Sequence, residues 1–209
     1  MNPKEFIERI ITLYRSARIL KFPHKKLHRG RSHSIASTAE DLLAYYLANK
    51  IKADAIFIDQ PVTIRHSKNQ VYPDLVIGRK GELVGFIDLK TDIGWHRDLL
   101  YSLCKEKYKW LHNVRGKECK IRDGLEKTDT LYKVSEKASF NIVIISDQNI
   151  KLEKLKKQVI ESKKLNPDVE VFILSKGKYL NTYGLSISDL MKRVIIDKKR
   201  FEKLISKFK

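Results

Sequence analysis

The residues best suited to chemistry are two aspartates and a lysine at the open end of a predicted β-hairpin. Two apolar runs, 75–77 and 83–89, are separated by a polar segment that contains two glycines. Gly-rich polar residues between two such runs are typical of a hairpin turn. Asp74 directly precedes the first run, whereas Asp88 and Lys90 lie at the end of the second. The pattern therefore predicts that the hairpin brings these three charged side chains together.

The register of the hairpin can be tested by counting. If the turn is centred on Gly81, Asp74 lies directly opposite Asp88. Directly opposed side chains have Cβ atoms about 4.5–5.5 Å apart, and like charges at that separation destabilise a sheet. A bound divalent cation would remove the repulsion, and carboxylate oxygens are ligands that Mg²⁺ and Mn²⁺ prefer. The spacing predicts a metal site at the end of the hairpin.

The face of the second strand also follows from the sequence. Because side chains alternate across a strand, Lys90 shares the face of Asp88, together with Val84 and Phe86. The two charged groups thus end an otherwise apolar face, where we expect a cleft.

Pro73-Asp74, followed by Asp88-Leu89-Lys90, resembles the signature of the PD-(D/E)xK nuclease superfamily. This superfamily includes restriction endonucleases and archaeal Holliday-junction resolvases, and the chain also resembles small nucleases of archaeal spindle-shaped viruses. In such enzymes the two acidic residues hold a catalytic metal on a bent hairpin, and the lysine helps to orient and activate the attacking water. The resemblance covers roughly residues 32–175. In the alternative interpretation, the hairpin simply carries three solvated charges.

The resemblance implies a Mg²⁺- or Mn²⁺-dependent DNA endonuclease. Asp74 and Asp88 would be metal ligands, with the backbone carbonyl of Leu89 as a further ligand, and Lys90 would stabilise negative charge on the reacting oxygens. Asp88 departs from the glutamate that is common in resolvases, and its side chain is shorter by one methylene. Both variants occur in the superfamily.

A third carboxylate is expected from the helix predicted over 34–50. PD-(D/E)xK nucleases often carry a glutamate on the helix before the catalytic sheet, and the resemblance implies that Glu40 has this role. In junction resolvases this glutamate follows a short basic segment that contains glycine, and Arg29-Gly30-Arg31 is similar. Asp41 is the neighbouring alternative, and points about 100° away on a helix. Glu40 could also be a solvated acid that the helix dipole stabilises.

The composition indicates a polyanionic partner. With 43 Lys and Arg against 25 Asp and Glu, the net charge is +18, so nucleic acid is the first candidate and an anionic membrane surface the second. No apolar run is long enough to span a bilayer, and the first residues lack a signal-peptide pattern, so we expect an intracellular protein. The two cysteines have no metal-binding spacing, which argues against zinc.

Basic residues in three segments are the candidates for DNA contact. The segments are the Gly- and Pro-containing stretch 21–34, the start of a helix predicted over 95–113, and a polar irregular segment over 113–138. Each could instead be a solvated linker, a helix cap or a mobile loop. The residues expected to contact phosphates are Lys25, Lys26, Arg29, Arg31, Arg97, Arg115 and Lys117.

The remaining pattern predicts one α/β domain over 1–209. Apolar spacing predicts helices over 4–19, 34–50, 95–113, 149–164 and 186–208, and strands over 54–65, 139–146 and 169–175. Pro61 would bend the first strand or place it at an edge. Strand, helix and strand at 139–175 predict a right-handed parallel crossover, and hence a mixed sheet. The order matches the αβββαβ core of restriction-endonuclease-like folds, with extra helices at both ends.

The expected function is therefore hydrolysis of phosphodiester bonds in DNA, with the specificity of a structure-selective, resolvase-like enzyme. A restriction-type endonuclease is one alternative. A DNA-binding protein that has kept the fold and lost catalysis is another. Symmetric cutting of two strands needs two active sites, so we also expect a homodimer.

Overall fold

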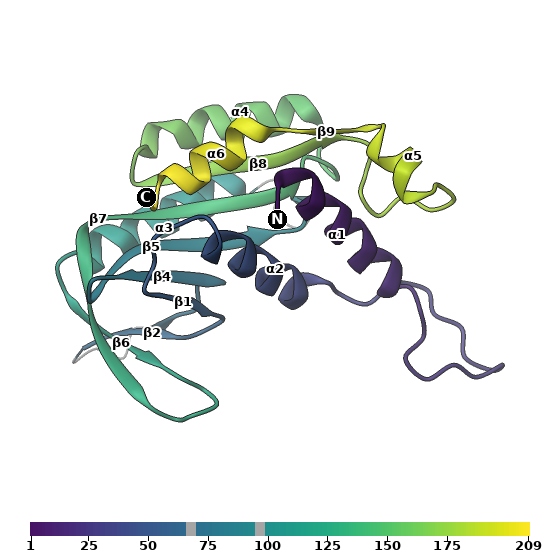
Figure 1. Ribbon diagram of the computed structural model, residues 1–209. Helices are drawn as coiled ribbons and strands as arrows, with labels where there is room; N and C mark the ends of the chain where they lie inside the picture. Colours follow the sequence, from purple (N-terminus) through teal and green to yellow (C-terminus); the bar gives the residue numbers. More distant parts are fainter. Residues whose placement is uncertain (66–69, 95–98) are drawn as a thin grey trace.

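A mixed β-sheet with helices on both faces forms the centre of the molecule (Figure 1). The computed structural model describes residues 1–65, 70–94 and 99–209. The predicted α/β class, with a mixed sheet flanked by helices, is confirmed. Within the described ranges, no helix is long and apolar enough to cross a membrane.

The long strand β7 organises the sheet. One edge of β7 pairs in parallel with β5, while the other edge pairs with β6 in its first part and with β8 in its second part. Figure 1 shows β7 crossing the molecule from the β6 hairpin towards α5. The strands are β1 (Ala55–Ile58), β2 (Val62–Ile64), β3 (Gln70–Val71), β4 (Leu75–Arg79), β5 (Glu82–Lys90), β6 (Glu118–Arg122), β7 (Asp129–Ser146), β8 (Val169–Gly177) and β9 (Val194–Ile196).

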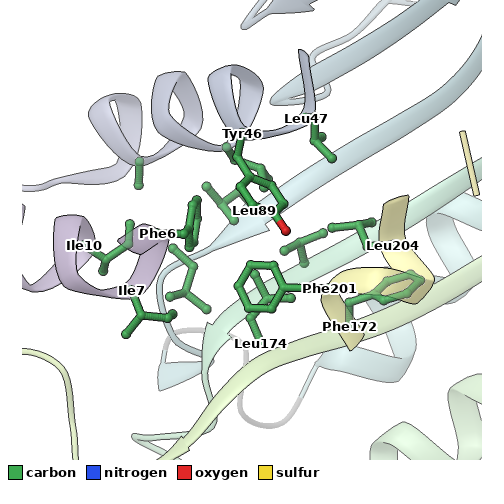
Figure 2. Packing of buried hydrophobic residues seen from close by; sticks show 14 of the residues in the cluster. Phe6, Ile7, Ile10, Tyr46, Leu47, Leu89, Phe172, Leu174, Phe201 and Leu204 are labelled. Atoms are coloured by element: carbon green, nitrogen blue, oxygen red, sulfur yellow. The ribbon is translucent and has the colours of Figure 1, made fainter. Parts of the chain in front are cut away.

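The helices divide between the two faces. The first face is covered by α1 (Pro3–Ser16), α2 (Ala36–Ala48), α5 (Ile187–Met191) and α6 (Lys198–Ser206). The opposite face is covered by α3 (Leu100–Val114) and α4 (Leu152–Ser162). On the first face, Phe6, Tyr46 and Phe201 pack edge to face with ring centroids 5.4–5.6 Å apart (Figure 2). Leu89 points into this core, and its burial anchors the end of β5.

The hairpin register predicted from counting is confirmed near the charged end. Leu75 pairs with Ile87, and the same register continues to Ile77 and Gly85. The turn differs from the predicted centre, because the register shifts after Ile77 and the loop is the pair Lys80-Gly81. Both loop residues have positive φ, the geometry that two-residue hairpin turns favour.

The shift corrects the expected position of Val84. Val84 packs against the core on the α1 and α2 face, whereas Phe86 lies in the core on the α3 and α4 face. The strict alternation fails because irregular pairing in this part of β5 changes the side-chain phase. Asp88 lies beyond the irregularity, so its face is still shared with Phe86.

The strand predicted over 54–65 is two strands. Pro61 separates β1 from β2. The two strands pair with different neighbours, β1 with β4 and β2 with β6. The expectation of a bend at Pro61 is therefore confirmed. Asp59, just before the bend, has a φ of 49°.

Two predicted segments were wrong. The stretch 113–138 is not irregular: β6 and the first part of β7 form an antiparallel hairpin in it. Buried Cys119 and Ile121 alternate with half-buried or exposed neighbours, which is a strand pattern that its many charges obscured. The single helix over 186–208 is α5, β9 and α6. The β-branched run Val194-Ile195-Ile196 pairs with β8 and interrupts it.

Candidate active site

The end of the hairpin brings the predicted acidic pair and lysine together. Asp74 Oδ2 accepts a hydrogen bond of 2.5 Å from the backbone N–H of Leu89. Lys90 Nζ lies 3.7 Å from the same oxygen. Burial raises the pKa of Asp74, and the negative charge of Asp88 contributes to the rise. The sequence prediction of a charged cluster at this position is consistent with this geometry.

Asp88 is the buried member of the cluster, with 5% of its surface exposed. Its Oδ2 lies 3.2 Å from Lys107 Nζ. Its Oδ1 is buried and has no hydrogen-bond partner among the described residues. An unsatisfied buried carboxylate oxygen is costly, because it has lost its hydration without compensation. The atom is therefore suited to receive a ligand that is a cation or a hydrogen-bond donor.

Glu40 on α2 belongs to the same electrostatic environment. Its pKa is raised to about 7, first by burial and then by the negative charges of Asp74 and Asp59, with Lys90 acting in the opposite direction. Asp41 is exposed and lines a groove between α1 and α2 instead. Of the two acids that the sequence offered, α2 therefore presents Glu40 to the cluster.

The raised pKa of Glu40 gives a pH-dependent stability with a definite sign. Below about pH 4.5 the carboxyl is protonated in both the folded and the unfolded chain. Between pH 4.5 and about 7 the folded chain holds the proton and the unfolded chain releases it, so the free energy of unfolding falls as pH rises. We expect Glu40→Gln, which cannot ionise, to gain stability relative to wild type from about pH 5 to about pH 8.

The measurement is chemical denaturation of both proteins in EDTA at these two pH values. A stability difference between wild type and Glu40→Gln that does not change with pH would show that Glu40 is not held in the folded state as described.

Burial also raises the pKa of Asp74. Lys90 opposes the shift, Asp88 adds to it, and the hydrogen bond from Leu89 opposes it. The fold thus disfavours the ionised carboxylate even though a lysine is adjacent. A divalent cation between Asp74 and Asp88 would reverse this balance, because it favours the ionised form of both groups.

The donor set fits a hydrated Mg²⁺ or Mn²⁺ rather than a cation enclosed by protein ligands. Among the described residues, no three His, Cys, Asp or Glu side chains gather closely enough to hold a metal alone. Mg²⁺, however, usually keeps several waters and is bound through one or two carboxylates plus substrate phosphates. The unpartnered Oδ1 of Asp88 fits this type of coordination. The carbonyl of Leu89 and the carboxylate of Glu40 remain predicted further ligands.

Lys107 is a site residue that was not identified from the sequence. Lys107 is one of several lysines on α3, as expected for a solvated helix, yet only 15% of its side chain is exposed. A signal for it exists in the buried stripe of α3, which runs Leu100, Cys104, Leu111 and Val114. Lys107 lies in this stripe at helical spacing, where a lysine needs a buried partner. That partner is Asp88.

Removing Lys107 is expected to destabilise the protein. Lys107→Met keeps the long apolar stem but leaves Asp88 buried without a counter-charge, and breaking such a pair costs about 3 kcal/mol. Lys105→Met, at an exposed position of the same helix, is the matched control and should change stability by less than about 0.5 kcal/mol. Urea denaturation of both variants in EDTA tests this. Equal stabilities of the two variants would contradict the pairing.

Millimolar Mn²⁺ adds a second readout for Lys107→Met. A metal bound at Asp88 would replace the missing positive charge. Mn²⁺ should therefore increase the stability of Lys107→Met more than that of Lys105→Met. If Mn²⁺ stabilises Lys107→Met no more than Lys105→Met, a metal does not bind at Asp88.

Five of the seven predicted phosphate-binding residues are exposed to solvent. Lys25, Lys26, Arg29 and Arg31 are all exposed on the segment that projects between α1 and α2 (Figure 1). Lys117 is exposed as well, and its Nζ lies 3.2 Å from Asn113 Oδ1.

Arg115 has a different environment, and Arg97 lies outside the described residues. The Arg115 guanidinium donates to the carbonyl of Ala138 and to the carboxylate of Asp168. These contacts join the end of α3 to β7 and to the loop before β8. Intramolecular contacts thus occupy the Arg115 guanidinium, in contrast to the exposed basic residues.

Comparisons with protein-family models, with curated proteins and with solved structures found no match to this chain. The interpretation of the site therefore depends on its residues and their geometry.

Proposed function

We propose that this protein is a metal-dependent DNA endonuclease of the PD-(D/E)xK type. Asp74 and Asp88 would hold Mg²⁺ or Mn²⁺, with Glu40 and the carbonyl of Leu89 as further ligands. The observation that carries the proposal is the buried Oδ1 of Asp88, which lacks a partner among the described residues and lies beside a second carboxylate and a lysine. The ion pair with Lys107 involves only Oδ2 of Asp88 and therefore does not account for the burial of Oδ1.

The order of elements supports the same proposal. The chain runs α2, β1, β4, β5, α3 and β7 through the centre of the sheet, with β2 and β3 inserted before β4 and β6 inserted before β7. This order agrees with the αβββαβ core expected from the resemblance. The parallel pairing of β7 with both β5 and β8 agrees with it too.

Each residue of the cluster has a chemical role in this proposal. A bound metal would supply Lewis-acid polarisation of the scissile phosphate and lower the pKa of a coordinated water. Lys90, held 3.7 Å from Asp74 Oδ2, would place a positive charge where negative charge develops on the phosphoryl oxygens. Glu40, whose pKa is raised to about 7 without metal, would be held ionised by the cation and would supply a further carboxylate oxygen to it.

DNA as the substrate is supported by charge. The net charge is +18, and segment 21–31 carries five Lys and Arg residues and no acid. These side chains are exposed on the segment that leads into α2, which carries Glu40. A strand held by this segment would be delivered to the cluster.

The test is cleavage of linear, nicked, flapped and four-way DNA with Mg²⁺, with Mn²⁺ and with EDTA. We expect nicking of at least one substrate with either metal and none with EDTA. We further propose a homodimer, which sedimentation on and off four-way DNA would reveal. A monomer under both conditions would contradict symmetric cutting.

One observation favours a non-catalytic DNA-binding protein as the second candidate. Lys107 already neutralises one oxygen of Asp88, as a substitute for a metal would. DNA binding without metal-dependent nicking of any of the four substrates would favour this candidate over the nuclease.

A further inference from the structure

A polar cleft of about 700 Å³ opens beside the proposed active site. It lies outside the carboxyl ends of the parallel strands β5, β7 and β8, the position where open α/β sheets commonly bind ligands. Asp92, which lines the cleft, follows Lys90 by two residues. Arg31, Tyr179, Asn181 and Tyr183 also line the cleft.

Tyr183 is held in the cleft as an exposed aromatic surface. It is 64% exposed, and the Arg18 guanidinium lies over its ring, with the central carbon 3.7 Å from the ring centroid. Arg18 is itself fixed, because it donates to Asn181 Oδ1 at 3.1 and 2.7 Å and to the carbonyl of Thr182 at 3.2 Å. The ring is therefore oriented by a stacked cation rather than by burial.

Such a ring is suited to stacking with a base. Proteins that bind single strands use exposed aromatic side chains in this way, because every base has a π-face. The Arg18 guanidinium on one side of the ring holds Tyr183 in a fixed orientation before a ligand binds. This preorganisation reduces the entropy cost of binding.

The negative charge of Asp92 favours binding of a base over a phosphate in the cleft. Asp92 accepts hydrogen bonds from the Gly94 N–H at 2.8 Å and from the Tyr179 hydroxyl at 3.1 Å. This fixed carboxylate repels a phosphate but can accept a hydrogen bond from the exocyclic amino group of a base. Arg31 at the rim, with the basic segment 21–31 behind it, is suited to the phosphates on either side.

We propose that this cleft binds an unpaired nucleobase of the DNA strand, stacked on Tyr183, next to the phosphate that is cut. The inference deepens the proposed function and rests on it for the position of the cut. A base in an intact duplex is stacked and paired, so it cannot enter without being extruded. The substrate class is therefore DNA with unpaired nucleotides beside the cut, such as a flap, a junction or a single strand, rather than continuous duplex.

The experiment measures base stacking directly and does not require cleavage. The full-length protein is titrated, in EDTA, into a short single-stranded oligonucleotide that carries 2-aminopurine, whose fluorescence is quenched by stacking. We expect quenching with wild type and with Tyr183→Trp. Tyr183→Ala should lose quenching and bind about 5- to 100-fold more weakly. Tyr45→Ala, at a 57% exposed tyrosine on α2, is the control and should resemble wild type.

The outcomes separate this inference from the proposed function. Quenching that depends on Tyr183 would support the cleft assignment even if no DNA is ever cut. Equal quenching and affinity for wild type and Tyr183→Ala would overturn it, even if metal-dependent cleavage is found. Duplex DNA that competes as well as the single strand would also overturn it.

Discussion

Asp88→Asn is expected to abolish DNA cleavage, with a loss of about 10³-fold or more, while DNA affinity stays the same or rises. The substitution removes the one carboxylate whose Oδ1 is buried and unpartnered within the described structure, and with it a proposed metal ligand. Loss of a catalytic metal removes several kcal/mol of charge stabilisation in the transition state, which accounts for the magnitude. Affinity should persist because the proposed phosphate contacts involve many basic residues and not Asp88.

The measurement pairs single-turnover cleavage with a binding titration. Asp147→Asn is the matched control, because Asp147 is equally buried, with 5% exposed, but follows β7 and contacts Gln148. It should cleave like wild type. Binding of wild type and Asp88→Asn should weaken steeply with salt, as counterion release requires. If Asp88→Asn cleaves DNA at the wild-type rate, Asp88 is not a metal ligand.

Asp74→Asn should change the response of the protein to metal rather than its basic stability. A metal that binds only the folded state stabilises by RT ln(1 + [L]/Kd), or about 2.7 kcal/mol at one hundred times Kd. Wild type should show this gain with Mn²⁺, and Asp74→Asn should gain much less because it has lost a ligand. Thermal unfolding of both proteins, with EDTA and with millimolar Mn²⁺, measures the difference.

The behaviour of Asp74→Asn without metal follows from the raised pKa of Asp74. An acid whose pKa is higher in the folded state destabilises the fold once pH rises above its ordinary range, because folding then opposes ionisation. The neutral amide avoids this cost and can still accept the hydrogen bond from Leu89. The variant should therefore melt at or above wild type in EDTA. A large loss of stability in EDTA would instead show that the ion pair between Asp74 and Lys90 is structural. Equal Mn²⁺-induced shifts in melting temperature for the two proteins would show that Asp74 is not a metal ligand.

Local patterns predicted the part of the site that lies on the hairpin. A turn centred on Gly81 predicts Asp74 opposite Asp88, and the observed pairing of Leu75 with Ile87 agrees. The agreement depends on the register shift after Ile77, which offsets the true position of the turn at Lys80-Gly81. The helix carrying Glu40 was also predictable from its apolar spacing. Which of Glu40 and Asp41 approaches the cluster depended on how α2 packs on the sheet, and the sequence left that open.

The parts that were missed depend on contacts between distant segments. Lys107 reads as one of several solvated lysines until α3 is placed over the Asp88 face of β5. The run Val194-Ile195-Ile196 reads as part of a helix until β8 offers it an edge to pair with. Val84 lies on the other face of the sheet from the predicted one because strand pairing is irregular there, and no local sequence pattern indicates this irregularity. In each case tertiary pairing overrode a local preference.

The most direct measurement is the number of Mn²⁺ ions bound to the folded chain, counted by electron paramagnetic resonance at about pH 8.5, where Glu40 is ionised. If Asp74 and Asp88 form a metal site, wild type binds at least one Mn²⁺ per chain, Asp147→Asn binds equally well, and Asp88→Asn and Asp74→Asn lose most of the binding. Binding by wild type that survives in both site variants, or no binding by wild type at any Mn²⁺ concentration that leaves the protein folded, would contradict the metal-dependent active site.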